Sequence, residues 1–462
     1  MKHLKKSLLF QLSFSALAVG LLAGWTNKPA NGPSPMLKIP VTYYKLSNGL
    51  KVVLSQDKTA PIIVVGVYYN IGFRIEPKNR TGFAHLFEHM MFQGSQNLGK
   101  MEFIKLVQSN GGILNGSTRF DFTNYFEAMP AHKLETALWA EADRMKGLDI
   151  TQANLTNQQG VVKNEVNVNV INQPYGGFPW LDMPQYANEN WYNAHNFYGD
   201  MKDLDSANLQ DVTSFFKTYY APNNAALVVS GDFEIADAKK WIDQYFSSIP
   251  SATIPPIPDL SEPKQEKEKR FIKEDKLANK PAIAIAYKMP EVNTPEYYAM
   301  GLIDQMLVQG NDSKLYQLLV QEKGYTSSVN GGVNYLGNLF NYNGPMLWMA
   351  NLIYDSTVTS DSVIAQFDKA ISDLQNISTE EVQLAKVKMR SGLYDIIGGQ
   401  FGIGKVDLLA SFALFYDDPS RINSLEQSFQ NVTAEQIKET AKAYLQPSNR
   451  TILIIDPKSV NK

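Results

Sequence analysis

The chain has 462 residues, of which 44% are hydrophobic and 19% are charged, and its formal net charge is −3 at pH 7. This near-neutral balance disfavours nucleic acid as a partner, because domains that bind nucleic acid are usually basic. The sequence contains no cysteine, so disulfides and thiolate metal ligands are both excluded. This length and composition predict a globular protein of two or three domains.

The first 30 residues are typical of a targeting segment. Three lysines among the first six residues precede a mostly apolar stretch from Ser7 to Trp25, which is the order found in a secretory signal peptide. We therefore predict a signal peptide over residues 1–30 and an exported, periplasmic protein. An uncleaved membrane anchor is the alternative for the same segment. After residue 30, no apolar run is long enough to predict another membrane span.

Residues 85–89 form a His-x-x-Glu-His pattern, and the apolar residues around it favour a helix. On a helix, His85 and His89 are four residues apart and point to one side, where two imidazoles can bind one metal ion. Glu88 lies beside them, where a carboxylate can take a proton from a metal-bound water. Two core histidines on a buried helix are the alternative. Because the chain has only five histidines, their spacing favours a metal site.

A third ligand is expected farther along the chain, because a catalytic zinc ion uses three protein ligands and keeps one position open. Without cysteine, this ligand has to be Asp, Glu or another His. The best candidate is Glu165, and 75 residues lie between His89 and Glu165.

Strands and helices alternate along the chain, which predicts an α+β layer fold. Residues 61–69 and 225–230 have the composition of buried strands, whereas residues 131–145 have the apolar spacing of a helix.

An internal repeat relates the two halves of the chain. Residues 216–224 resemble 441–449, and the helix with the metal motif resembles residues 301–310, where Gly301 and Gln305 replace the two histidines. We therefore predict a duplicated domain. In chain order, we expect an N-terminal metal-binding domain over residues 38–250, a Pro-rich linker over 251–270, and a homologous C-terminal domain without metal ligands over 271–460.

These features together resemble the pitrilysin/insulinase-like family of zinc peptidases, and within it an exported bacterial member of the processing-peptidase type. The inverted motif and the Val-Val-x-x-Glu run that ends at Glu165 carry the resemblance. Weaker likenesses lie at residues 46–54, 72–76, 112–118 and 219–224. The resemblance implies two α/β-layer domains that form a clam shell. It also implies one Zn²⁺ per chain, held by His85, His89 and Glu165, with Glu88 as the catalytic base.

Several positions matter for the support of this site and for substrate binding. Many family members have a supporting Glu seven residues before the distal metal ligand, where this chain has Gln158. The resemblance gives a supporting role to Asn115 as well. An Arg and a Tyr that bind substrate in the second half of many members are replaced by Val320 and Ser327.

The two replacements lead us to predict a second homologous subunit that supplies the missing Arg and Tyr. The alternative is that Tyr325 or Lys323 serves instead, and that the chain works alone or as a homodimer. The substrate-binding residues of this chain stay unknown from the sequence.

The function predicted is that of a zinc-dependent endopeptidase that hydrolyses peptides or small unfolded proteins. Glu88 would activate a zinc-bound water for attack on the scissile carbonyl, and would then pass the proton to the leaving amine. The alternative is a non-catalytic assembly or scaffold subunit, or a peptide-binding subunit, of the same fold. The intact Glu88 argues against this alternative, because a scaffold does not need it.

Overall fold

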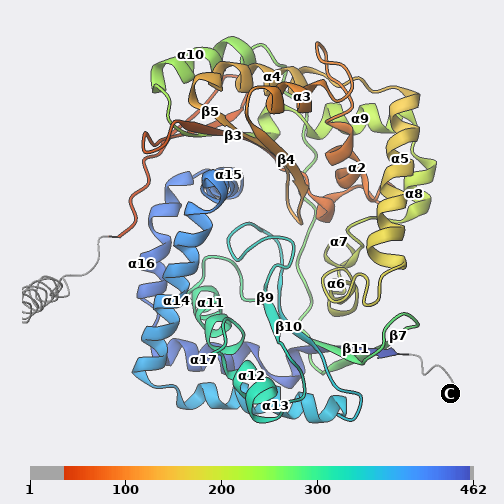
Figure 1. Cartoon of the computed structure of the whole chain (residues 1–462), viewed down its shortest axis with the longest axis vertical. Coiled ribbons are helices and arrows are strands. Elements are labelled where there is room, and N and C mark those ends of the chain that lie inside the picture. Colours follow the sequence, from red (N-terminus) through yellow and green to blue (C-terminus); the bar gives the residue numbers. More distant parts are fainter. Residues whose placement is uncertain (1–35, 458–462) are drawn as a thin grey trace, which may run out of the picture. The chain divides into compact units, whose positions relative to one another are not determined.

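Two mixed β-sheets organise the structure, which is a computed structural model (Figure 1). The first sheet has six strands in the order β1-β2-β6-β3-β5-β4. Strands β2 and β6 run parallel, and the other neighbouring pairs are antiparallel. The strands are β1 (Thr42–Lys45), β2 (Lys51–Gln56), β3 (Ile62–Tyr69), β4 (Ile113–Thr118), β5 (Thr123–Pro130) and β6 (Ala225–Gly231).

The second sheet repeats this pattern with five strands in the order β7-β11-β8-β10-β9. Strands β7 and β11 are parallel, as β2 and β6 are, and the remaining pairs are antiparallel. The shared order and directions confirm the predicted duplication within an α+β fold. The strands are β7 (Lys269–Asp275), β8 (Ala282–Lys288), β9 (Asn330–Val333), β10 (Leu347–Ile353) and β11 (Arg450–Pro457).

Helices lie on both faces of the first sheet (Figure 1). Helices α2 (Phe83–Met90) and α4 (Leu134–Lys146) pack on one face, whereas α15 (Ile403–Tyr416), from the second half of the chain, packs against β2, β3 and β6. Because β3 is covered on both sides, nearly all of its residues are buried, and it reads as a continuous apolar run. The same half contains α3 (Glu102–Ser109), α5 (Gln152–Val166), α9 (Leu209–Tyr219) and α10 (Ile235–Phe246).

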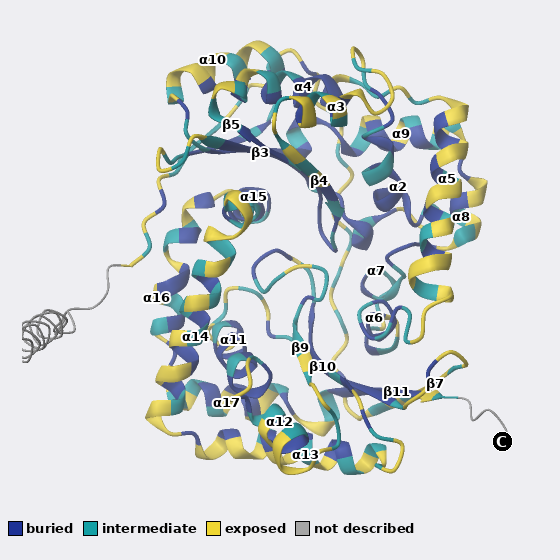
Figure 2. Ribbon diagram, in the orientation of Figure 1, coloured by how far each residue is buried: buried dark blue, intermediate teal, exposed yellow. Residues whose placement is uncertain are grey.

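Local sequence signals fix several helix starts. Thr151 accepts a hydrogen bond from the backbone of Asn154 at the start of α5, and Asn208 forms a capping box with Asp211 at the start of α9. These side chains satisfy backbone donors that have no partner inside the helix. Figure 2 shows that the outward faces of α5 and α10 are exposed, whereas β3 is buried.

In the second half, helix α11 takes the place that α2 has in the first. The helices of this half are α11 (Pro295–Leu307), α12 (Lys314–Tyr316), α13 (Ser360–Asp373), α14 (Thr379–Gly398), α16 (Leu425–Gln430) and α17 (Ala434–Tyr444), besides α15. Residues 251–266 form no helix or strand and lead into β7. Helix α6 (Asp182–Ala187) contacts β8 and β11, so a segment that precedes this connection packs on the second sheet.

The structure describes residues 36–457, so the predicted signal peptide over residues 1–30 lies outside the described residues. The strands and helices of the described residues all belong to the compact unit Lys38–Lys462. Among the described residues, no helix combines the length and the apolar character that crossing a bilayer requires.

Candidate active site

Helix α2 begins at a glycine that the local geometry requires. Gly82 has φ of 81°, in the left-handed region, and a Cβ atom there would lie 2.5 Å from the carbonyl oxygen of Tyr198. The first turn of α2 is capped by Glu76. The carboxylate of Glu76 accepts hydrogen bonds from the backbone nitrogens of Gly82 at 2.8 Å and Ala84 at 2.5 Å. A carboxylate is favourable at this end of a helix dipole, so Glu76 holds the first turn of α2, which contains His85.

The structure brings His85, His89 and Glu165 together, and we call these three side chains the metal cluster. Helical spacing places the Nε2 atoms of His85 and His89 3.3 Å apart. Glu165 lies in the last turn of α5, which continues as a π-helical segment, η3 (Asn167–Ile171). Its carboxylate oxygens lie 3.6 Å from Nε2 of His85 and 3.4 Å from Nε2 of His89.

These separations fit a tetrahedral metal ion. Zinc bonds of about 2.0–2.1 Å in tetrahedral geometry separate two ligand atoms by about 3.3–3.4 Å. The three side chains present ligand atoms that all lie within 4.8 Å of one another. The donor set of two imidazoles and one carboxylate is also one that zinc accepts.

Two of the three side chains, His85 and Glu165, have pKa values shifted toward the form that binds a metal ion. Burial and, secondarily, the neighbouring His89 lower the pKa of His85 to about 4, so its imidazole is neutral near pH 7. The hydrogen bond from His89 is the main cause that holds the pKa of Glu165 below its usual range. His85 is buried, whereas the side chains of His89 and Glu165 are 21% and 29% exposed, so the cluster is accessible from one side.

Glu88 lies next to the cluster and is held from β4. Thr118, at the end of that strand, donates a hydrogen bond of 2.8 Å to Oε2 of Glu88. Burial raises the pKa of Glu88, and the bond from Thr118 opposes this shift. A carboxylate with a raised pKa is closer to the protonation balance that a general base needs near neutral pH.

Tyr198 is a further residue of the site. Its hydroxyl donates to Oε1 of Glu165 at 3.2 Å, and its ring lies 5.1 Å from the ring of His85. In the sequence it belongs to an aromatic stretch that gives no sign of this contact. Thr118 lies within a segment that resembles the family, but its bond to Glu88 follows only from the fold.

The two predicted supporting residues lie outside the metal cluster. Gln158 is buried on α5, and its amide donates to the side chain of Asn157 at 2.9 Å. Asn115 is exposed on β4 and accepts a hydrogen bond from the backbone of Gly116. The supporting role of both residues stays a prediction.

Val320 and Ser327 lie in the second half of the chain. Val320 is half-buried in the π-helical segment η5 (Gln317–Glu322), and Ser327 is exposed in the connection to β9. Tyr325, the alternative substrate-binding residue, is half-buried between them.

Helix α11 of the second copy has other residues at the positions that correspond to the motif on α2. Gly301, Asp304 and Gln305, which we call the second-copy site, line a cavity of about 350 Å³. Asp304 is buried and accepts hydrogen bonds from Nε1 of Trp348 at 2.8 Å and from Nε2 of Gln309 at 3.0 Å. Burial is the main cause that raises the pKa of Asp304 to about 6.

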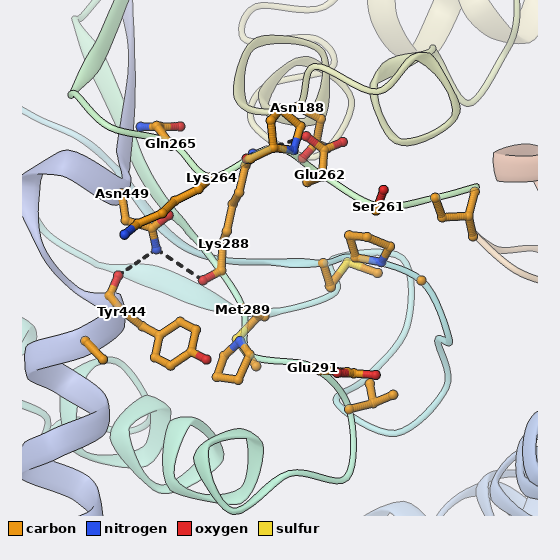
Figure 3. A pocket seen from close by; sticks show the side chains of 18 of the residues that line it. Asn188, Ser261, Glu262, Lys264, Gln265, Lys288, Met289, Glu291, Tyr444 and Asn449 are labelled. Carbon is orange, nitrogen blue, oxygen red and sulfur yellow. Dashed lines mark hydrogen bonds and ion pairs between the residues drawn. The ribbon is translucent and has the colours of Figure 1, made fainter.

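A larger cavity, of about 990 Å³, is lined by residues of the connection before β7 and by the second half of the chain (Figure 3). Lys288 on its wall is paired with Glu262 at 3.1 Å. Asn449 donates to the carbonyl oxygens of Lys288 and Tyr444. Its lining includes no residue of the metal cluster.

A duplicated α+β fold whose first copy carries the inverted His-x-x-Glu-His motif defines the class of pitrilysin/insulinase-like proteins. Residues 51–188 match the family model described as insulinase (peptidase family M16), and residues 206–389 match the model described as the peptidase M16 inactive domain. The chain belongs to the M16 (insulinase) peptidase family.

Similarity to proteins that are named as peptidases supports a peptidase function for this chain. The zinc protease PqqE of Helicobacter pylori is 24% identical over 421 residues, which are 89% of this chain and 92% of that protein. The beta subunit of the mitochondrial-processing peptidase of Bos taurus is 21% identical over 427 residues, which are 91% of this chain and 86% of that protein.

Solved structures show the same fold. A protease from Helicobacter pylori superposes with a TM-score of 0.84 at 23% identity, over 91% of this chain and 100% of that chain. A peptidase M16 inactive domain from Pseudomonas fluorescens has a TM-score of 0.77 at 18% identity, over 92% of this chain and 99% of that chain.

Proposed function

We propose that this chain is a zinc-dependent endopeptidase that hydrolyses peptides or small unfolded proteins. The observation that carries the proposal is the spacing of the metal cluster, where ligand atoms lie 3.3 Å, 3.4 Å and 3.6 Å apart, together with the half-buried carboxylate of Glu88 beside it. His85, His89 and Glu165 would hold one Zn²⁺ and leave a position open, as catalytic sites do.

The residues around the cluster have distinct tasks in this reaction. Bound zinc supplies a Lewis acid that makes a water molecule more acidic and polarises a carbonyl group. Because Thr118 occupies Oε2 of Glu88, we assign to Oε1 the proton taken from the attacking water. Glu88 then gives this proton to the leaving amine. Tyr198 orients Glu165 through its hydroxyl.

The edge of the first sheet supports a peptide as the substrate. Strand β4 is the last strand of that sheet, and its final residue, Thr118, contacts Glu88. An edge strand presents unpaired backbone groups, to which an extended peptide can add as a further strand. A peptide along β4 would therefore run toward Glu88 and the metal cluster.

A second homologous subunit is part of the proposal. Its support is Val320 and Ser327, which lack the cation and the phenol expected for binding a carbonyl group, and a relative that is named as the beta subunit of a peptidase. A partner could supply the missing donors, which stabilise charge that develops on the carbonyl oxygen. Export to the periplasm is proposed from the N-terminal segment, and a structural neighbour with 18% identity is named as a periplasmic protease of Escherichia coli.

The test is an assay of the full chain with quenched fluorescent peptides. The chain is freed of metal with a chelator and reloaded with one equivalent of zinc, alone and mixed with a candidate partner, a chain of the same family that has Arg and Tyr where this one has Val320 and Ser327. We expect cleavage that disappears with the chelator and returns with zinc. Vigorous cleavage by the chain alone would contradict the need for a partner. Zinc binding without cleavage in either mixture would contradict the peptidase and indicate a binding subunit.

A further inference from the structure

We propose that His195 is a positioning residue for helix α2, which acts as a doubly protonated imidazolium paired with the buried carboxylate of Glu76. This inference rests on the proposed metal site, because the segment that Glu76 holds leads directly into His85. It assigns a role to a histidine outside the His-x-x-Glu-His motif.

The ring of His195 lies between two backbone carbonyl groups. Its Nδ1 atom is 3.0 Å from the carbonyl oxygen of Trp191, and its Nε2 atom is 2.6 Å from that of Phe73. The ring stacks on the indole of Trp191 at 4.2 Å with an interplanar angle of 8°. The imidazole is therefore held in one orientation.

This arrangement requires a proton on each ring nitrogen. A carbonyl oxygen only accepts hydrogen bonds, and a neutral imidazole has one N–H and one lone pair. In either neutral form, a lone pair would face a carbonyl oxygen at hydrogen-bonding distance. The imidazolium donates to both carbonyls, and the 2.6 Å contact has the short length of a charge-assisted hydrogen bond.

A buried positive charge needs a compensating group, and Glu76 provides it. The side chains of His195 and Glu76 are 5% and 0% exposed, and Oε2 of Glu76 lies 3.8 Å from Nε2 of His195. Burial raises the pKa of Glu76, and His195 is the first of the groups that oppose this shift. The other charged or titratable groups around the pair are Lys78 above the Trp191 ring, Arg74 with Asp121, and Tyr192, Tyr219 and Tyr220.

The pair reaches the metal cluster through the start of α2. The ionised Glu76 accepts two backbone hydrogen bonds, from Gly82 and Ala84. Without the charge of His195, burial would favour the protonated carboxyl group, which has an O–H in place of one acceptor site. The first turn of α2 would then lose part of its anchor, and His85 would no longer be held in the geometry that zinc requires.

The protonation state of His195 is measured directly on the wild-type chain. Long-range ¹H–¹⁵N correlation spectra of the imidazole rings distinguish two protonated nitrogens from one, and the signals are assigned by their loss in single His→Gln variants. We expect both ring nitrogens of His195 to carry a proton at neutral pH, because each faces a backbone carbonyl oxygen. A single-proton tautomer at about pH 6 would overturn the proposal.

Zinc affinity tests the positioning role. We expect His195→Gln and Glu76→Gln each to raise the zinc Kd about tenfold or more, as loss of an outer partner of a metal ligand does. The double variant should lose less than the product of the two single effects, because one pair is broken in each case. The matched control is His132→Gln, because His132 is exposed on the segment before α4 and should leave the Kd unchanged.

Both readouts are independent of peptide cleavage, so they separate this inference from the proposed function. If the chain cleaves no peptide but His195 is doubly charged and its variants weaken zinc binding, the positioning role stands without the peptidase. If the Kd of His195→Gln equals that of His132→Gln, the positioning role is wrong even in an active enzyme.

Discussion

Helices α2 and α11 take the same place in two copies of one fold, yet they carry different chemistry. The apolar residues that pack each helix on its sheet are present in both, so burial alone accounts for them. The positions proposed to bind metal differ, since His85 and His89 on α2 correspond to Gly301 and Gln305 on α11. Packing therefore preserves the helix in each copy, whereas the residues facing the site are set by its chemistry.

Glu88 on α2 and Asp304 on α11 occupy corresponding positions, and their contacts show the same difference in more detail. Asp304 uses both of its oxygens to accept hydrogen bonds, from Trp348 and Gln309, which makes it a structural link inside the second copy. Glu88 is held through Oε2 by Thr118 and lies beside the metal cluster. A buried carboxylate that keeps an oxygen for a reacting proton fits a general base better than one whose two oxygens are engaged.

The largest expected effect is on metal binding. We predict that Glu165→Ala weakens zinc binding strongly, because it removes one of three metal ligands. The loss of affinity should exceed the roughly 10–100-fold loss caused by removing a residue that only hydrogen-bonds to a metal ligand. Gln305→Ala is the matched control in the second copy and should retain one zinc per chain.

Gln158→Glu should leave zinc binding unchanged or tighten it, because it adds a negative charge on α5, the helix that carries Glu165. Metal analysis after dialysis measures all three, and full zinc in Glu165→Ala would move the third ligand elsewhere.

A smaller effect concerns the pH dependence of stability in the second copy. Burial raises the pKa of Asp304 from 3.8 to about 6, so the folded chain holds a proton there that the unfolded chain has already released. The contribution of Asp304 to stability therefore falls as the pH rises from about 4 to about 6, by about 3 kcal/mol at most, and is constant above that range. In Asp304→Asn this dependence should be absent.

Urea unfolding of both proteins at several pH values across this range is the measurement. The difference in unfolding free energy between Asp304→Asn and the wild type should change with pH in favour of the variant as the pH rises. A difference that stays constant from about pH 4 to pH 6 would contradict the assigned pKa.

The sequence was sufficient to predict the duplicated fold and the helix with the motif, for reasons visible in particular residues. The apolar run of residues 61–69 predicts the buried strand, and the spacing of His85 and His89 depends only on helical geometry. The helix expected over residues 131–145 is observed as α4, although its first residues form a short 3-10 segment, Ala131–Lys133. Such boundaries depend on capping contacts that a local pattern does not contain.

Contacts between distant residues could not be predicted in the same way. Tyr198 and Glu165 are 33 residues apart, and Thr118 and Glu88 are 30 apart, so only the packed fold brings them together. Glu76 gave no such signal either, because it lies six residues before Gly82 and only the fold brings its carboxylate to the start of α2. Nothing in the sequence joins Glu76 to His195, since that contact depends on how the loop before α2 packs against the end of α7 (Trp191–Ala194).

The most direct test of the contrast between the two copies compares Glu88→Gln with Asp304→Asn. Both variants replace a carboxylate by an amide of similar size, one in each copy, and both are assayed in the composition that cleaves peptides. We predict that Glu88→Gln retains one zinc per chain but cleaves at least about 10²-fold more slowly, the low end for loss of a general acid–base group. Asp304→Asn should cleave at close to the wild-type rate. Cleavage at the wild-type rate by zinc-loaded Glu88→Gln would contradict the role of Glu88 as the general base.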